Sequence, residues 1–130
     1  MLFRSLDQDG DLDIVTGDFN SPPQILSSNL AQSAGGVRWL EVVLRGQRSN
    51  RDGLGARVSV VAGGQAQHQV HDGQSGYLTQ SSAPLYFGLG TASEVERIEI
   101  VWPSGTRQTV PGPLPGNRRV VIEEDRKSTV

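Results

Sequence analysis

Residues 56–71, ARVSVVAGGQAQHQVH, hold the pattern that decides the fold. Apolar residues occupy every second position over 56–62, which is the period of a half-buried β-strand. The pair Gly63-Gly64 follows, and glycine tolerates the positive φ that a two-residue hairpin turn needs. We therefore predict a β-hairpin whose return strand is 65–71.

The same alternation recurs on both sides of this hairpin. It predicts further strands, bounded by Gly or Pro turn signals, at residues 38–45, 84–89, 97–102, 106–110 and 119–123. Residues 111–117 are rich in Pro and Gly and are predicted as a loop. Thr91 or Ser93 with Glu94 or Glu96 is the one helix signal, a short capped turn. Six or seven short strands predict an all-β fold, a β-sandwich or jelly-roll-like domain.

Composition excludes several classes of protein. The chain has 130 residues, room for one ordinary domain and an arm. Its 12 basic and 14 acidic residues give a net charge of −2, which provides no basic face for nucleic acid. Without cysteine it has no disulfide and no thiolate metal site. No apolar run approaches the ~20 residues of a membrane span.

Residues 7–13, DQDGDLD, place four carboxylates at alternate positions around one glycine. This is the arrangement of oxygen ligands and sharp turn that Ca²⁺ requires. Gly10 fits the glycine position of such a loop, and Thr16 then stands where an EF-hand has its bidentate Glu. The loop is therefore not an EF-hand. The predicted ligands are Ser5, Asp7, Asp9, Asp11 and Asp13. The alternative is an acidic, solvated turn that binds no metal.

The loop runs straight into a short strand that begins at residues 14–17. In this it resembles the FG-GAP/VCBS repeat, the blade unit of integrin-like β-propellers, with Asn29 as the candidate for the trailing Asn of that family. Ser5 departs from the family's Asp, so the resemblance implies a weak, degenerate calcium site. A propeller has several four-stranded blades, and residues 1–30 hold at most two short strands. We expect the chain to be the C-terminal part of a longer protein with upstream propeller repeats.

A second resemblance covers residues 37–124. It is carried by the blocks WLEV (39–42), SNRDGLGARV (49–58), GYL (76–78), FGLG (87–90) and VWPSG (101–105). These blocks occur in the order of the ASPIC/UnbV domain, and that family implies a module that follows FG-GAP/VCBS repeats in secreted or cell-surface proteins. We therefore expect a partial repeat and linker at 1–34, an ASPIC/UnbV β-sandwich at 35–125 and a tail at 126–130.

The polar turn 50–55 lies between two predicted core strands, and two interpretations remain open. It is either a structural turn bent at Asp52-Gly53, or part of a ligand surface on neighbouring loops. The residues of that candidate surface are Asn50, Arg51, Asp52, Ser75, Tyr77 and Gln80.

Catalytic signals are weak. Residues 73–77, GQSGY, lack the final glycine of the G-x-S-x-G motif. His71 and Asp72 are adjacent and would point to opposite faces of a strand, as would His68 and His71. We predict that both histidines face solvent and that the protein has no catalytic residue.

These observations predict a non-catalytic interaction or adhesion module that is secreted, at the cell surface or periplasmic. Its ligand is a protein or a glycan, with no nucleic acid and no membrane span. The alternative is a carbohydrate-binding module of a larger secreted protein, with Trp39 and Tyr77 as stacking platforms. Trp102 alternates in phase with Ile98 and Ile100, so it is expected to be buried.

Overall fold

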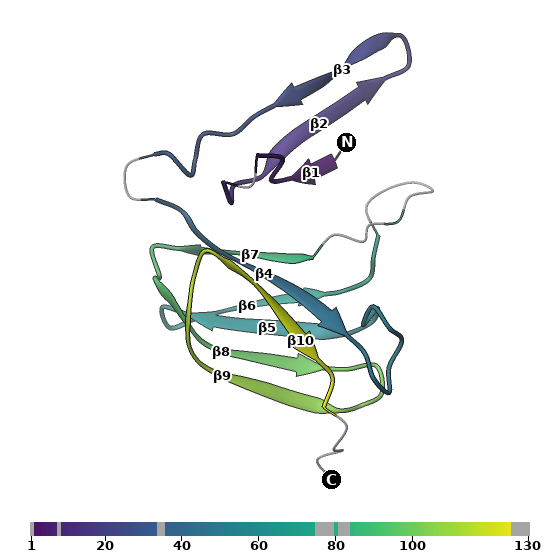
Figure 1. The fold of residues 1–130 in the computed structure, drawn as a ribbon, viewed down its shortest axis with the longest axis vertical. Coiled ribbons are helices and arrows are strands. Elements are labelled where there is room, and N and C mark those ends of the chain that lie inside the picture. The colour runs from purple at the N-terminus through teal and green to yellow at the C-terminus, as the bar shows by residue number, and fades with distance from the viewer. Residues whose placement is uncertain (1, 8, 34–35, 75–79, 81–83, 126–130) are drawn as a thin grey trace.

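The computed structural model describes residues 2–7, 9–33, 36–74, 80 and 84–125. These residues form strands and no helix, which confirms the predicted all-β fold. The strands, labelled in Figure 1, are β1 (Leu2–Arg4), β2 (Asp13–Asp18), β3 (Ser21–Leu26), β4 (Arg38–Arg45), β5 (Arg57–Ala62), β6 (Gln65–Val70), β7 (Leu85–Gly90), β8 (Glu94–Val101), β9 (Arg107–Pro115) and β10 (Arg118–Glu123). Accordingly, the described part of the chain contains no helix with the length and hydrophobicity to cross a membrane.

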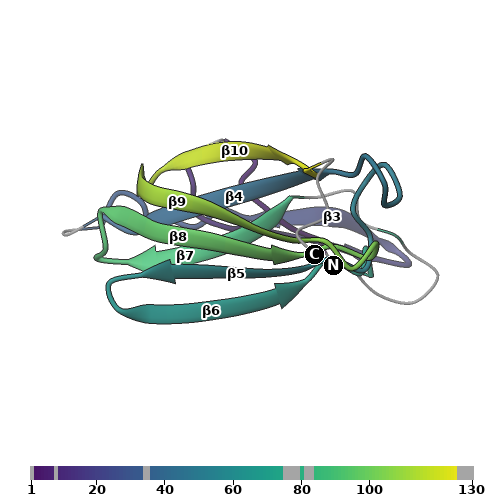
Figure 2. The same ribbon diagram turned by 90° about the horizontal axis from the view of Figure 1, so that it is seen from below.

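Strands β4 to β10 form two sheets that pack face to face. One sheet has the order β10-β4-β7 and the other the order β6-β5-β8-β9. In Figure 1, β4 and β10 run obliquely across the four-stranded sheet, and Figure 2 shows the two layers from below. The arrangement is consistent with the predicted β-sandwich.

The core lies between these two sheets and is built from alternate residues of their strands. The buried residues that alternation predicted are Leu40, Val42, Leu44, Val58, Val60, Leu85, Phe87, Leu89, Ile98, Ile100 and Trp102. Each large apolar side chain contributes about 1.5–3 kcal/mol by leaving water. Trp102 is only 2% exposed, and its indole Nε1 donates to Gln108 Oε1 at 2.8 Å. Its predicted burial is confirmed.

The predicted hairpin is also confirmed. β5 and β6 pair antiparallel, and Ala62 opposite Gln65 closes the two-residue turn. Gly63 and Gly64 have φ of +57° and +73°, the left-handed values that favour glycine in this turn type. The register of the whole β5–β6 pair follows from this turn.

Two local predictions are wrong. Residues 111–115, predicted as loop, continue strand β9, and no helical turn precedes β8, which begins at Glu94. β9 is an edge strand, so one of its sides needs no hydrogen-bond partner. Pro111, Pro113 and Pro115 all lie in this edge strand, where a missing N–H is tolerated. A register shift between Val95 and Arg97 accommodates the pairing.

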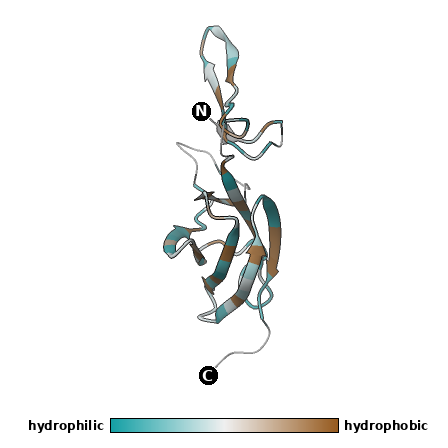
Figure 3. Ribbon diagram, turned by 90° about the vertical axis from the view of Figure 1, so that its left-hand side faces the viewer, coloured by the Kyte–Doolittle hydropathy of each residue, from teal (hydrophilic) through white to brown (hydrophobic). Residues whose placement is uncertain are grey.

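The N-terminal arm, residues 2–33, departs from its prediction as well. It forms a separate antiparallel sheet of order β1-β2-β3, where at most two strands and a linker had been predicted. β3 contains Pro22 and Pro23, is exposed along its whole length and pairs only on one side with β2. Prolines are tolerated on such an edge. Figure 3 shows the arm projecting from the sandwich.

Candidate ligand pocket and acidic loop

The edge of the sandwich between β6 and β7 has no backbone pairing, because the two strands belong to different sheets. Two inward-facing glutamines of β6 bridge it. Gln67 Nε2 donates to the Gly88 carbonyl at 2.5 Å, and Gln69 Nε2 donates to the Tyr86 carbonyl at 2.7 Å. They satisfy carbonyls on the free edge of β7, which protects that edge from pairing with other chains.

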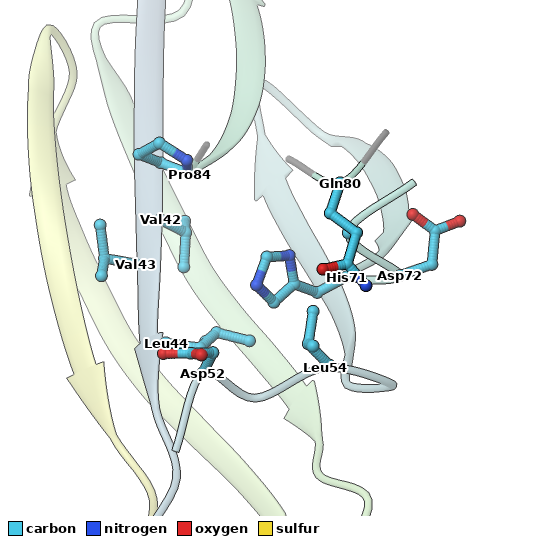
Figure 4. A pocket seen from close by; sticks show the side chains of 10 residues that line it. Val42, Val43, Leu44, Asp52, Leu54, His71, Asp72, Gln80 and Pro84 are labelled. Atoms are coloured by element: carbon cyan, nitrogen blue, oxygen red, sulfur yellow. The ribbon is translucent and has the colours of Figure 1, made fainter. Parts of the chain in front are cut away.

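The bridging ends at Gln69, and His71 follows two residues later, just beyond the end of β6. There the edge opens into a pocket of about 320 Å³, shown in Figure 4. Its apolar lining is Val42, Val43, Leu44, Leu54 and Pro84, and its polar lining is Asp52, His71, Asp72, Gly73 and Gln80. The pocket therefore joins an apolar floor to a few polar groups, the usual composition of a ligand site.

The turn before β5 places Asp52 at this pocket. Asn50 holds the turn, because its Oδ1 accepts from Leu54 N–H and its Nδ2 donates to the Leu54 carbonyl, both at 2.7 Å. Asn50 thus has the structural role that one interpretation proposed for this turn. Asp52 is exposed and lines the pocket, and Figure 4 shows its carboxylate beside Leu44.

His71 is held by backbone hydrogen bonds on both sides. Its N–H donates to the Ala56 carbonyl at 2.8 Å, and its carbonyl accepts from Gly55 N–H at 2.7 Å. Figure 4 shows the imidazole in the middle of the pocket, while the Asp72 carboxylate points away from it. The prediction that both histidines face solvent holds for His68, which is exposed, whereas His71 is half-buried and lines the pocket. The signal was the spacing of two residues, because His71 follows the half-buried Gln67 and Gln69 of β6 in the same alternation, just beyond the end of the strand.

The structure brings together two of the six residues predicted for the ligand surface, Asp52 and Gln80. Arg51 is exposed and does not line the pocket. Ser75 and Tyr77 lie outside the described residues. Trp39, a predicted stacking platform, is half-buried and stacks on Tyr86 with ring centroids 6.1 Å apart.

A Ser–His pair lies on the outer face of the four-stranded sheet. Ser59 Oγ and His68 Nδ1 are 2.6 Å apart, a distance suited to a nucleophile and its base. However, β5 is paired with β6 and β8 on its two sides. Its backbone N–H groups are therefore used in the sheet and cannot form an oxyanion hole beside Ser59. The geometry favours a surface hydrogen bond over catalysis.

The acidic loop of the arm folds around Gly10. Ser5 Oγ accepts from Gly10 N–H at 3.1 Å, Asp7 Oδ1 accepts from Asp9 N–H at 3.2 Å, and Asp9 Oδ1 accepts from Asp11 N–H at 3.1 Å. The hydrogen bond from Asp11 N–H is the main cause that lowers the pKa of Asp9. These bonds turn the side chains of Ser5, Asp7 and Asp9 back toward the loop.

The last two carboxylates of the loop are buried. Asp13 is 1% exposed and accepts from Leu6 N–H at 2.7 Å and from Ser28 N–H at 2.9 Å. Asp11 is 3% exposed; its Oδ2 accepts from Ala31 N–H at 2.8 Å, but its Oδ1 has no hydrogen-bond partner among the residues that the structure describes. A buried carboxylate oxygen without a partner is costly, so a cation near Asp11 fits the loop.

The predicted ligand side chains of the loop are not gathered around one point. Among the described residues, no three His, Asp or Glu side chains are grouped so that they could hold a metal ion. Calcium binding would therefore require side-chain rotation in the loop, which favours weak affinity. Asn29, the candidate trailing Asn, accepts at its backbone carbonyl from Ser33 Oγ at 3.1 Å.

Comparison with known proteins identifies relatives of this chain. The sequence model of the ASPIC and UnbV family matches residues 46–129. Cartilage acidic protein 1 of Mus musculus and of Homo sapiens are each 34% identical over 100 residues, 76% of this chain. The Xenopus tropicalis protein of that name is 31% identical over 112 residues, 83% of this chain. The chain spans 15% of the mouse and human proteins and 17% of the Xenopus protein.

Proposed function

The chain belongs to the ASPIC and UnbV family, and from this premise we propose that it is a non-catalytic interaction module of a secreted or cell-surface protein. The observation that carries the proposal is the pocket at the edge of the sandwich. The name of the relatives, cartilage acidic protein, supports an extracellular setting. The Ser59–His68 pair lies on β5, which is paired on both sides, and this favours a surface hydrogen bond for that pair.

The chemistry of the pocket favours a Lys or Arg side chain of a protein partner. Val42, Leu44 and Leu54 offer apolar surface to the aliphatic stem of such a side chain. The Asp52 carboxylate can accept hydrogen bonds from the cationic head, and charge-assisted bonds of this kind are about twice as strong as neutral ones. The Gln80 amide oxygen is a further acceptor.

We expect Asp52→Asn to weaken binding of Lys- or Arg-containing peptides by about tenfold, because it removes the charge that faces the cationic head. A peptide array with Lys, Arg and neutral side chains at one position would find the sequence, and fluorescence polarisation would give the Kd. Glu94→Gln is the matched control, since Glu94 is exposed at the start of β8 and does not line the pocket. Equal binding by all three proteins would overturn the pocket assignment.

A glycan array run in parallel tests the alternative of a carbohydrate-binding module. Trp39 is already stacked on Tyr86 inside the chain, which makes it a poor platform for a sugar. Glycan binding that disappears in Tyr77→Ala, with the fold retained, would replace the peptide proposal.

We also propose that the arm is a partial FG-GAP/VCBS repeat. Its three strands are one fewer than a propeller blade contains. Phe19 at the β2–β3 turn is 96% exposed, and Ile25 and Leu26 are 63% and 55% exposed. Exposed apolar residues on an incomplete blade support packing against a neighbouring repeat.

In a longer natural form of the protein, we expect Phe19 to be protected from solvent. Hydroxyl-radical footprinting followed by mass spectrometry should label Phe19 strongly in the 130-residue chain and several-fold less in the longer protein. Leu54, which is 40% exposed on the sandwich, is a control for equal radical dose. Equal labelling of Phe19 in both proteins would contradict the repeat assignment.

We propose in addition that the acidic loop binds Ca²⁺ weakly. Ser5, Asp7, Asp9 and Asp13 would supply side-chain oxygens and Asp11 its carbonyl. The unpartnered Oδ1 of Asp11 supports a cation nearby. Bound Ca²⁺ would offset the repulsion among these carboxylates and hold the arm's loop in one conformation.

A further inference from the structure

Two aromatic residues contact the acidic loop from the outer face of the β10-β4-β7 sheet of the sandwich. Trp39 of β4 and Tyr86 of β7 stack with an interplanar angle of 12°. The Tyr86 hydroxyl donates to the carbonyl oxygen of Gly10. The two rings therefore form a surface of the sandwich that meets the centre of the loop.

Gly10 is required at this contact for two reasons. Its φ of +98° is one that L side chains rarely adopt. In addition, a Cβ built at Gly10 would overlap the Trp39 indole at Nε1, so any side chain would displace either the loop or the indole. The glycine that makes the turn of the loop is thus also the residue that contacts the sandwich.

Electrostatics keep Tyr86 a hydrogen-bond donor. Burial, followed by the negative charges of Asp11, Glu41 and Asp9, raises the pKa of Tyr86 to about 12. Glu41 Oε2 in turn accepts from Arg119 Nε at 2.6 Å. The hydroxyl, which is protonated at neutral pH in any tyrosine, is here still harder to ionise, and it donates to the Gly10 carbonyl.

We propose that Trp39 and Tyr86 form a docking platform for the acidic loop, so that cation binding in the loop and docking of the arm stabilise each other. This rests on the proposed Ca²⁺ binding. The platform fixes the carbonyl of Gly10, and the residues on either side, Asp9 and Asp11, carry ligand oxygens. Coupling of this kind is reciprocal: a platform that favours the ion-bound loop is itself favoured by the ion.

The test is a calorimetric Ca²⁺ titration of the 130-residue chain, Tyr86→Phe and Val121→Ala. Tyr86→Phe removes the hydroxyl and keeps the ring, and we expect it to weaken Ca²⁺ binding about fivefold. Val121→Ala is the control, because Val121 is an exposed residue of β10, on the same sheet, and does not belong to the platform. Equal affinity of all three proteins would overturn the coupling and leave the calcium site standing.

A calcium-free measurement tests docking by itself. We expect Gly10→Ala to shift tryptophan emission to longer wavelength, because the added methyl group separates the loop from Trp39. Gly64→Ala is the matched control, since Gly64 also has positive φ but nothing lies within 4 Å of its Cβ position. Identical emission of the two variants would overturn docking. A chain that docks but shows no heat with Ca²⁺ would overturn the calcium function and the coupling together.

Discussion

Replacing Glu124 by alanine is expected to lower the free energy of unfolding by about 3 kcal/mol. Glu124 is 2% exposed, and its carboxylate is surrounded by donors. Oε2 accepts from the backbone N–H groups of Gln47, Arg48 and Ser49 at 2.9, 2.8 and 2.7 Å. Oε1 accepts from the hydroxyls of Ser49 and Ser104 at 2.9 and 2.5 Å. One carboxylate thus joins three segments that are distant in the sequence.

Alanine would leave these donors without an acceptor, and buried donors without partners are costly. Chemical denaturation would measure the loss. Glu123→Ala is the control: its side chain is 61% exposed, its ion pair with Arg45 is long at 3.9 Å, and we expect a change within about 0.5 kcal/mol. Similar destabilisation by both substitutions would show that the Glu124 cluster has no special role.

The same cluster predicts a dependence of stability on pH. Burial by itself would raise the pKa of Glu124, but hydrogen bonds from Ser104, Ser49, Gln47 and Arg48 outweigh it and lower the pKa from 4.5 to about 2. A lowered pKa in the folded state means that the ionised form stabilises the fold. This stabilisation is complete above pH 4.5 and is lost as the pH falls toward 2. Thermal melts should show this loss in the natural chain and a shallower one in Glu124→Gln.

Asp9→Ala is expected to abolish Ca²⁺ binding by the acidic loop. The natural chain should bind at or beyond the weak end of the ~10⁻⁴–10⁻³ M range of extracellular calcium modules, because Ser5 replaces a carboxylate. Ser5→Asp should tighten binding, since it restores a charged ligand at the position whose side chain already accepts from Gly10 N–H. Calorimetric titration of the three proteins measures both effects.

Asp18→Ala is the control for general loss of negative charge on the arm. Asp18 ends β2, outside the loop, and its Oδ1 accepts from Phe19 N–H. An unchanged affinity in Ser5→Asp, together with no effect of Asp7→Ala and Asp13→Ala, would show that the loop is an acidic turn. Asp13→Ala should in addition destabilise the arm, because the buried Asp13 carboxylate accepts hydrogen bonds from the backbone N–H groups of Leu6 and Ser28.

Local patterns in the sequence were sufficient to predict most strands of the sandwich. Alternation over 38–45 and 56–62 identified the buried faces of β4 and β5, because successive side chains of a strand point to opposite faces of its sheet. Gly63-Gly64 determined the β5–β6 register for a similarly local reason. The acidic loop could be recognised because all its proposed ligands lie within a few residues of Gly10.

Tertiary structure decided what depends on residues far apart in the chain. The parallel pairing of β10 with β4 joins Arg118–Glu123 to Leu40–Arg45, and neither segment encodes its partner. The proline-rich part of β9 is a strand only because it lies at an edge of its sheet. The pocket likewise required Asp52 and His71, which are far apart in the sequence, to lie at the same edge of the sandwich, between β6 and β7. The platform required β4 and β7 to bring Trp39 and Tyr86 to Gly10, since contacts between distant segments follow from packing and not from local periodicity.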